Sequence, residues 1–237
     1  MDSQRTGRIF GWFFIATFIT SIPARLLFIN GLDTSWSDTS FTPGAVSDTS
    51  IRLGAILEFL LIGFNIATAV VLYPLAKRLS ATLALGYVAA RIMESVFIAI
   101  GLVAIVAVID VNDAWLGASG AAATALEANG NTLVSLYDWA FQFGPGLVVG
   151  FGNGLLLGYL MYRSGLVPPR MALLGLVGGP LLILSFVLIL FGVFENGSGP
   201  SGLMTLPEAA WELSLGIYCA WKGFRPSPLV QPTATTE

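Results

Sequence analysis

The sequence contains no histidine and only one cysteine, Cys219. The missing histidines exclude the common zinc motifs and the histidine-based catalytic triads. A single cysteine excludes a disulfide within the chain. The acidic residues show no spacing that is typical of a Mg²⁺ or Ca²⁺ loop. The sequence therefore predicts no metal site, no cofactor and none of the common nucleophile–base pairs.

Charged residues are also scarce, at 11% of the 237 residues, whereas soluble domains carry about 25%. Hydrophobic residues make up 55% of the chain, and the mean hydropathy is +0.80. These values predict an all-α membrane protein whose main partner is the lipid bilayer. The net charge of −3 and the lack of a basic patch argue against nucleic-acid binding.

Six apolar runs are long enough to cross a bilayer as helices. They lie at residues 9–29, 53–76, 82–108, 133–162, 171–194 and 203–221. Lysine and arginine residues mark alternate ends of these runs, with Arg52 as the exception, and this pattern predicts cytoplasmic N- and C-termini. We expect one domain over residues 1–226, a bundle of six transmembrane helices, and a disordered tail at residues 227–237.

The N-terminus also resembles a signal peptide, because Arg5 and Arg8 precede an apolar stretch and a Ser-Ile-Pro-Ala sequence at residues 21–24. We favour retention of this segment, since cleavage would remove the first of the six spans. Two further stretches, residues 33–50 and 110–131, are rich in small or polar residues and are predicted to be external loops.

The fourth run carries a ridge of small residues. Glycines recur there at four-residue intervals, as Gly146, Gly150, Gly154 and Gly158. Such a ridge lets a neighbouring helix approach closely, so we expect it to pack inside the chain or to form a homo-oligomer contact. The run would be about 45 Å long as a helix, longer than the hydrocarbon core, which predicts a tilt or a kink at Pro145.

Two charges, Arg91 and Glu94, lie in the middle of the third run. Each should cost about 2.5 to 3.5 kcal/mol near the membrane centre. Their i,i+3 spacing places them on one helical face, so we expect them to face protein or water and to find partners there. They are either part of a ligand or proton site, or a buried ion pair that fixes helix register.

Other spans carry polar residues at a similar depth in the outer half of the membrane. The candidate binding residues are Arg25, Glu58, Asn65, Tyr87, Arg91, Glu94, Asp138, Gln142 and Glu212. Five of the six helices contribute to this layer, and we expect their side chains to converge on one outward-opening cavity. Carboxylates outnumber guanidinium groups there, so one carboxyl can stay protonated at neutral pH, and proton coupling or cation binding is chemically reasonable.

Individual members of this layer also have structural explanations. Glu208, near Glu212, fits the last position of a capping box that begins at Thr205, which would make it a helix-start residue. Glu58 and Asp138 could lie near helix N-termini, where the helix dipole favours carboxylates. Arg25 could extend to the outer headgroups.

Several separated motifs resemble one known family. They are Leu85-Gly86-Tyr87 with Arg91-Ile92-Met93-Glu94, Tyr137-Asp138-Trp139-Ala140-Phe141, Tyr162-Arg163-Ser164-Gly165-Leu166-Val167-Pro168, and the ending from Glu212 to Lys222-Gly223-Phe224. Through them, residues 5–224 resemble a bacterial and archaeal integral-membrane family known as domain of unknown function 4386. The resemblance implies a six-helix protein of the bacterial or archaeal cell membrane. It brings no activity, cofactor or catalytic residue.

The sequence favours a non-enzymatic function, the binding or transport of a small polar or cationic solute, or of protons, in the polar layer. One alternative is an intramembrane enzyme that uses a carboxylate as acid or base and Arg91 to hold an anionic group. The other is a structural or stress-related membrane component in which the buried charges only fix helix register.

Overall fold

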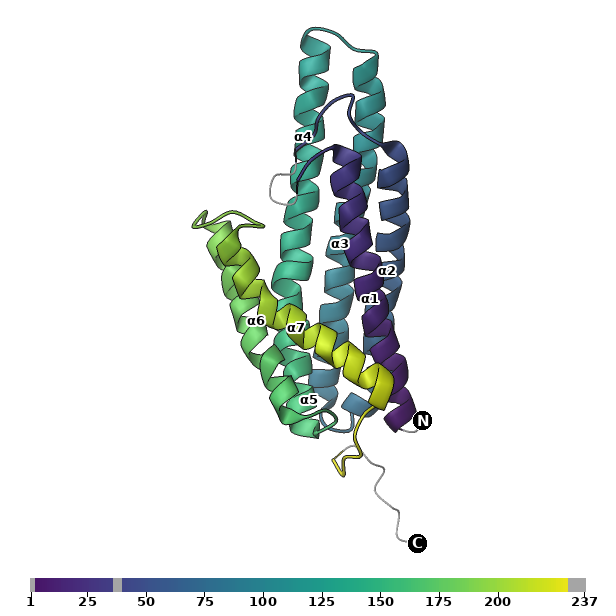
Figure 1. Cartoon of the computed structure of the whole chain (residues 1–237), viewed down its shortest axis with the longest axis vertical. Coiled ribbons are helices and arrows are strands. Elements are labelled where there is room, and N and C mark those ends of the chain that lie inside the picture. The colour runs from purple at the N-terminus through teal and green to yellow at the C-terminus, as the bar shows by residue number, and fades with distance from the viewer. Residues whose placement is uncertain (1–2, 36–39, 230–237) are drawn as a thin grey trace.

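The computed structural model describes residues 3–35 and 40–229, and in these residues every regular element is a helix, as predicted (Figure 1). The elements are α1 (Ser3–Leu32), α2 (Asp48–Ala76), α3 (Ala81–Leu116), α4 (Ala121–Phe141), η1 (Gln142–Val148), η2 (Gly150–Leu157), α5 (Gly158–Ser164), α6 (Pro169–Leu190) and α7 (Gly199–Lys222). The α elements are α-helices, and η1 and η2 are π-helical.

Five helical stretches are long and apolar enough to cross a membrane, which makes the chain a multi-pass membrane protein. They are α1, α2, α3, the continuous stretch Ala121–Ser164, and α6. The sixth predicted span corresponds to α7, which is not among them. This helix is less apolar because it carries Glu208 and Glu212 together with a proline and several small polar residues.

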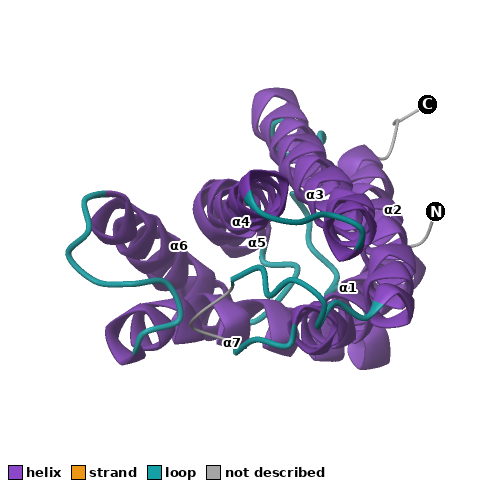
Figure 2. Cartoon of the chain, turned by 90° about the horizontal axis from the view of Figure 1, so that it is seen from above, coloured by secondary structure: helices purple, strands orange, loops and turns teal. Residues whose placement is uncertain are grey.

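The helices form an upright bundle that α7 crosses obliquely. In Figure 1, α7 runs from the far end of α6 to the end of the bundle where α1 begins. Along this path it packs on α1, α6 and η2. Seen from above, α1, α2, α3, α4 and α7 surround one central region, and α6 lies to its side (Figure 2). Side chains on the inner faces of these helices therefore meet in that region.

Two glycines bring α1 and α7 together. A Cβ atom on Gly11 would lie 2.6 Å from the carbonyl carbon of Cys219, and one on Gly7 would lie 2.8 Å from that of Gly223. Real Cβ atoms do not approach other atoms so closely. Only glycine therefore permits this backbone contact, which fixes α7 against the start of α1.

The prediction of an external loop at residues 110–131 is wrong. Both α3 and α4 extend through this stretch, and only residues 117–120 form the turn between them. Alanine is the strongest helix former, which favours helix at the start of α4. Phe41 from the α1–α2 connection packs onto Gly130, and its backbone N–H donates to Asn131 Oδ1 at 3.1 Å. The predicted loop at 33–50 is also shorter, because α2 begins at Asp48.

The long fourth span contains two π-helical segments. The stretch Ala121–Ser164 is continuous over 44 residues and contains η1, which includes Pro145, followed by η2. Proline has no N–H to donate to the helical hydrogen-bond ladder. Turns of this kind are rare and are frequently found at functional sites.

The predicted glycine ridge packs within the chain, mainly on α6. A Cβ on Gly150 would lie 2.8 Å from the carbonyl oxygen of Gly179, and a Cβ on Gly154 would lie 2.9 Å from the backbone nitrogen of Gly179. Gly158 faces α6 in the same way, next to Leu176. The nearest neighbours of Gly146 belong to its own helix.

The chain after α7 returns to the α5–α6 connection. The backbone N–H of Arg225 donates to the carbonyl oxygen of Leu166 at 2.8 Å. The hydroxyl of Ser227 donates to the backbone carbonyl oxygen of Ser164. Ser227, the first residue of the predicted tail, is thus buried. The part of that tail at residues 230–237 lies outside the described residues.

Candidate functional site

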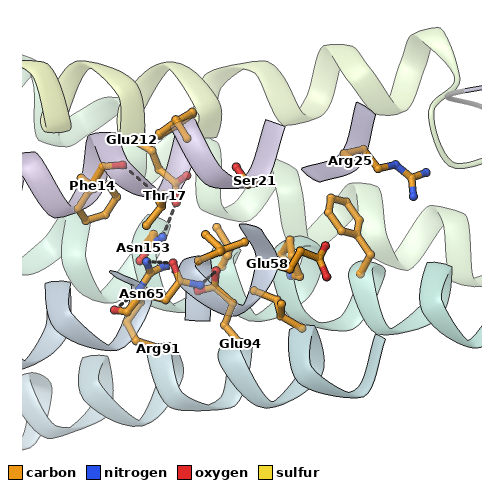
Figure 3. Close-up of a pocket in the computed structure, with 16 residues that line it drawn as sticks. Phe14, Thr17, Ser21, Arg25, Glu58, Asn65, Arg91, Glu94, Asn153 and Glu212 are labelled. Carbon is orange, nitrogen blue, oxygen red and sulfur yellow. Dashed lines mark hydrogen bonds and ion pairs between the residues drawn. The ribbon is translucent and has the colours of Figure 1, made fainter. Parts of the chain in front are cut away.

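A cavity of about 150 Å³ lies inside the bundle. It is lined by side chains from α1, α2, α3, the α4–η2 stretch and α7 (Figure 3). The polar and charged residues of the lining are Thr17, Ser21, Arg25, Glu58, Asn65, Arg91, Glu94, Asn153 and Glu212. Aromatic and aliphatic side chains complete the wall, so the polar groups converge in a largely apolar enclosure.

Six of the predicted binding residues line this cavity. They are Arg25, Glu58, Asn65, Arg91, Glu94 and Glu212. Asp138 does not line it but pairs with Arg25. Tyr87 is buried in the hydrophobic core, and Gln142 is buried on η1 away from the lining. The structure thus brings together polar residues from four separate predicted spans, along with Asn153 from the long fourth one.

Arg91, Glu94 and Asn65 form a closed polar cluster. Arg91 donates from Nη1 to Glu94 Oε2 at 2.6 Å, from Nη2 to Asn65 Oδ1 at 2.5 Å, and from Nε to the carbonyl oxygen of Asn65 at 3.3 Å. Asn65 Nδ2 in turn donates to Glu94 Oε1 at 3.0 Å. All three residues are buried. The two charges therefore compensate each other, and the cluster joins α2 to α3.

Arg25 belongs to a second cluster, toward the other end of the cavity. Its Nη1 lies 3.5 Å from Asp138 Oδ1, and its Cζ lies 5.5 Å from the ring centre of Tyr137 and 5.8 Å from that of Phe141. The residue is only 7% exposed. Arg25 thus points into the protein, where an acid and two aromatic faces stabilise its charge, and does not extend to headgroups.

The helix-end explanations for the acids are also wrong. α4 begins at Ala121, so Asp138 lies far from a helix N-terminus. α2 begins at Asp48, which places Glu58 in its third turn. α7 begins at Gly199, so Glu208 is an interior helix residue and not part of a capping box. These carboxylates need another explanation for their burial.

Two lining acids lie near an arginine but form no ion pair with it: the Arg25 charge acts on Glu58, and the Arg91 charge acts on Glu212. Glu58 Oε1 accepts a hydrogen bond from the Tyr137 hydroxyl at 3.3 Å, whereas Glu58 Oε2 is buried without a partner in the described part of the chain. Glu212 accepts a hydrogen bond from Asn153 Nδ2. Within residues 3–35 and 40–229, neither acid forms an ion pair with a lysine or arginine. The cavity therefore keeps two carboxyl groups that a bound cation or proton can neutralise.

The size of the cavity limits its occupant. A volume of about 150 Å³ equals about five water molecules at roughly 30 Å³ each. Drug-sized ligands need pockets of roughly 300 to 1,000 Å³. The described residues contain no group of three or more His, Cys, Asp or Glu side chains arranged to hold a metal ion. A monovalent ion with part of its water shell, or a small organic cation, fits this space.

Several lining residues, such as Thr17, Ser21, Asn153 and Phe18, were not among the predicted binding residues. Asn153 lies on η2, where its backbone carbonyl accepts a hydrogen bond from Trp211 Nε1 at 2.9 Å. An asparagine in a glycine-rich apolar run is a signal that could have identified it. Phe18 also lines the cavity, but phenylalanine is common in membrane spans, so nothing in the sequence marks it.

No curated protein and no solved structure matches this chain. A family model does match, over residues 9–223, which is nearly the whole chain. The family resemblance inferred from the separated motifs is thereby confirmed. The chain belongs to the family described as a domain of unknown function (DUF4386).

Proposed function

We propose that this protein binds a small cation in the cavity and carries it across the membrane. The observation that supports this function is the charge balance of the cavity. Among the described residues, Arg91 forms an ion pair with Glu94 and Arg25 with Asp138, so these two arginines act on Glu212 and Glu58 only from a longer distance. In a region of low dielectric constant, carboxylates that outnumber the nearby cations attract positive charge and repel anions.

Features of the surrounding helices favour transport over static binding. Pro145, Val149 and Asn153 line the cavity, and they lie in or between the π-helical segments η1 and η2. Transporters commonly place their ion sites at helices whose regular hydrogen bonding is interrupted. The same segment packs on α6 through glycines. Small movements of this helix would therefore change access to the cavity.

The proposal includes six spans, with both termini in the cytoplasm of a bacterial or archaeal cell. The 24 residues of α7 correspond to about 36 Å of helix, enough to cross a hydrocarbon core of about 30 Å at a tilt. The lysines and arginines near the start of α1, the α2–α3 turn, the α5–α6 turn and the end of α7 lie toward one end of the bundle (Figure 1). Arg52, at the other end, pairs with Asp48 at 3.1 Å.

Cysteine labelling tests this topology. We expect Gly202→Cys, at the start of α7, to react with a membrane-impermeant maleimide added outside intact cells. Leu229→Cys, beyond the end of α7, should react only after the cells are opened. Cys219 is fully buried and should stay unlabelled. Labelling of both introduced cysteines from the same side would contradict a transmembrane α7.

Flux measurements in reconstituted vesicles test the function. Vesicles that contain the protein should release Na⁺, K⁺ or methylammonium down a gradient faster than empty vesicles. Glu58→Gln and Glu212→Gln should each lower this flux by about tenfold or more, which corresponds to a loss of about 1.4 kcal/mol of cation stabilisation. Both replacements keep the side-chain shape and remove the charge.

The matched control for these variants is Glu127→Gln, because Glu127 is exposed on α4 outside the cavity. Its flux should equal that of the unmodified protein. Unchanged flux in both cavity variants, or the absence of flux for every cation, would rule out the proposed function.

A further inference from the structure

A further buried carboxyl lies next to the cavity but does not line it. Glu208 on α7 is 2% exposed and points into a notch made by glycines of α6 and η2. A Cβ on Gly178 would lie 2.7 Å from Glu208 Oε2, and one on Gly154 would lie 3.0 Å from the same atom. The missing side chains of these glycines create the space that the carboxyl occupies.

This carboxyl has no hydrogen-bond partner in the described part of the chain. Neither Glu208 Oε1 nor Glu208 Oε2 accepts a hydrogen bond from any described residue. The helices packed on α7 are α1, α6 and η2, and in the described residues none of them presents a charged group to Glu208. The charged group that faces it is Glu212, one turn further along α7.

An ionised carboxylate in such a place would be expensive. Its effective desolvation penalty is several kcal/mol when neither a counter-charge nor a donor replaces water. A second carboxylate at i+4 on the same helical face adds repulsion. Glu208 therefore carries a proton in the arrangement seen here, while Glu212, which lines the cavity and is hydrogen-bonded by Asn153, can carry the negative charge.

We propose that Glu208 is a proton-binding site whose proton is exchanged for the cation that binds at Glu212. This inference rests on the proposed function of the cavity. Before exchange, the pair of carboxyl groups holds one proton on Glu208 and has a net charge of −1. When a monovalent cation binds at Glu212, its positive charge offsets the repulsion and supplies the counter-charge that the Glu208 carboxylate lacked, so the O–H bond of Glu208 breaks and the proton leaves to water. The two carboxylates and the cation again sum to −1.

Infrared absorption detects the proton directly. The purified protein at neutral pH should show the C=O band of a protonated carboxyl, and this band should shift in D₂O. Glu208→Gln should remove the band, while Glu127→Gln should leave it intact. A band that persists unchanged in Glu208→Gln, or its absence from the unmodified protein, would overturn the assignment. Glu208→Met, which introduces no hydrogen-bond donor, provides the same comparison if the Glu208→Gln variant does not fold.

Proton release tests the exchange. In weakly buffered detergent solution with a pH indicator, adding the cation that the vesicle assay identifies should release about one proton per bound cation. Glu208→Gln and Glu208→Met should still bind the cation and release none. Equal proton release by these variants and by the unmodified protein would refute the exchange. If the unmodified protein binds no cation, the proposed function fails, while the infrared band still decides whether Glu208 holds a proton.

Discussion

Glu94→Ala is expected to destabilise the folded protein by about 3 to 5 kcal/mol, because it leaves Arg91 as a buried charge without its counter-charge. Arg91 is 2% exposed and donates to Glu94 at 2.6 Å. Asn65 would remain as a partner, but its amide cannot neutralise the guanidinium. Arg91→Ala should be destabilising for the converse reason, since Glu94 would then be buried with only an amide donor.

The double variant, Arg91→Ala with Glu94→Ala, should lose much less stability than the sum of the two single changes, because it removes both charges together. Thermal unfolding in detergent micelles measures all three proteins. Arg52→Ala provides the control: its pair with Asp48 is exposed, and such pairs contribute about 0.5 kcal/mol or less. Additive losses in the double variant would show that the two charges do not stabilise each other.

The same variants separate a structural cluster from a ligand site. If the double variant folds and also keeps full cation flux, the Arg91–Glu94 pair only fixes the register of α2 and α3. If it folds but has lost flux, the pair also shapes the site. The closed set of hydrogen bonds among Arg91, Glu94 and Asn65 favours a stabilising role for this cluster, with Glu58 and Glu212 left to face the cation.

Gly11→Leu is expected to separate α7 from α1. A Cβ alone would lie 2.6 Å from the carbonyl carbon of Cys219, and backbone atoms cannot move aside as a flexible side chain can. We expect a loss at or above the upper end of the roughly 1 to 3 kcal/mol that overpacking costs. Cation flux should fall as well, because the displaced helix carries Glu212. Thermal unfolding and vesicle flux measure the two effects.

Gly63→Leu is the matched control. Gly63 also lies inside a helix, on α2, but a Cβ there would meet no described atom within 4 Å. Replacing a helical glycine in open space should improve stability by up to about 1 kcal/mol through helix propensity. Equal stability of the two leucine variants would mean that α1 and α7 do not pack closely at Gly11.

Much of the site could be predicted from the chain, because lipid does not solvate charge. Arg91 and Glu94 lie deep in an apolar run, and such residues must turn towards protein or water. This one constraint was enough to group six of the cavity residues. It does not identify which charges form ion pairs, since hydropathy cannot show that Arg25 forms its ion pair with Asp138.

Other features depend on information that hydropathy does not contain. The stretch at residues 110–131 is helical although it is not apolar, because helix propensity and the packing of Phe41 on Gly130 stabilise it. Glu208 matched a local capping pattern, yet α7 begins nine residues earlier at Gly199. Asn153 lies in the π-helical segment η2, and hydropathy does not distinguish π-helical from α-helical turns.

The hairpin of α3 and α4 offers a practical route to imaging the protein. α3 has 36 residues, about 54 Å of helix, and in Figure 1 both helices of the hairpin extend past their neighbours to the turn at residues 117–120. A soluble protein fused into that turn would be held by two continuous helical stretches at once. It would then act as a rigid fiducial for electron microscopy, where a particle of 25.1 kDa surrounded by a micelle gives little contrast for alignment.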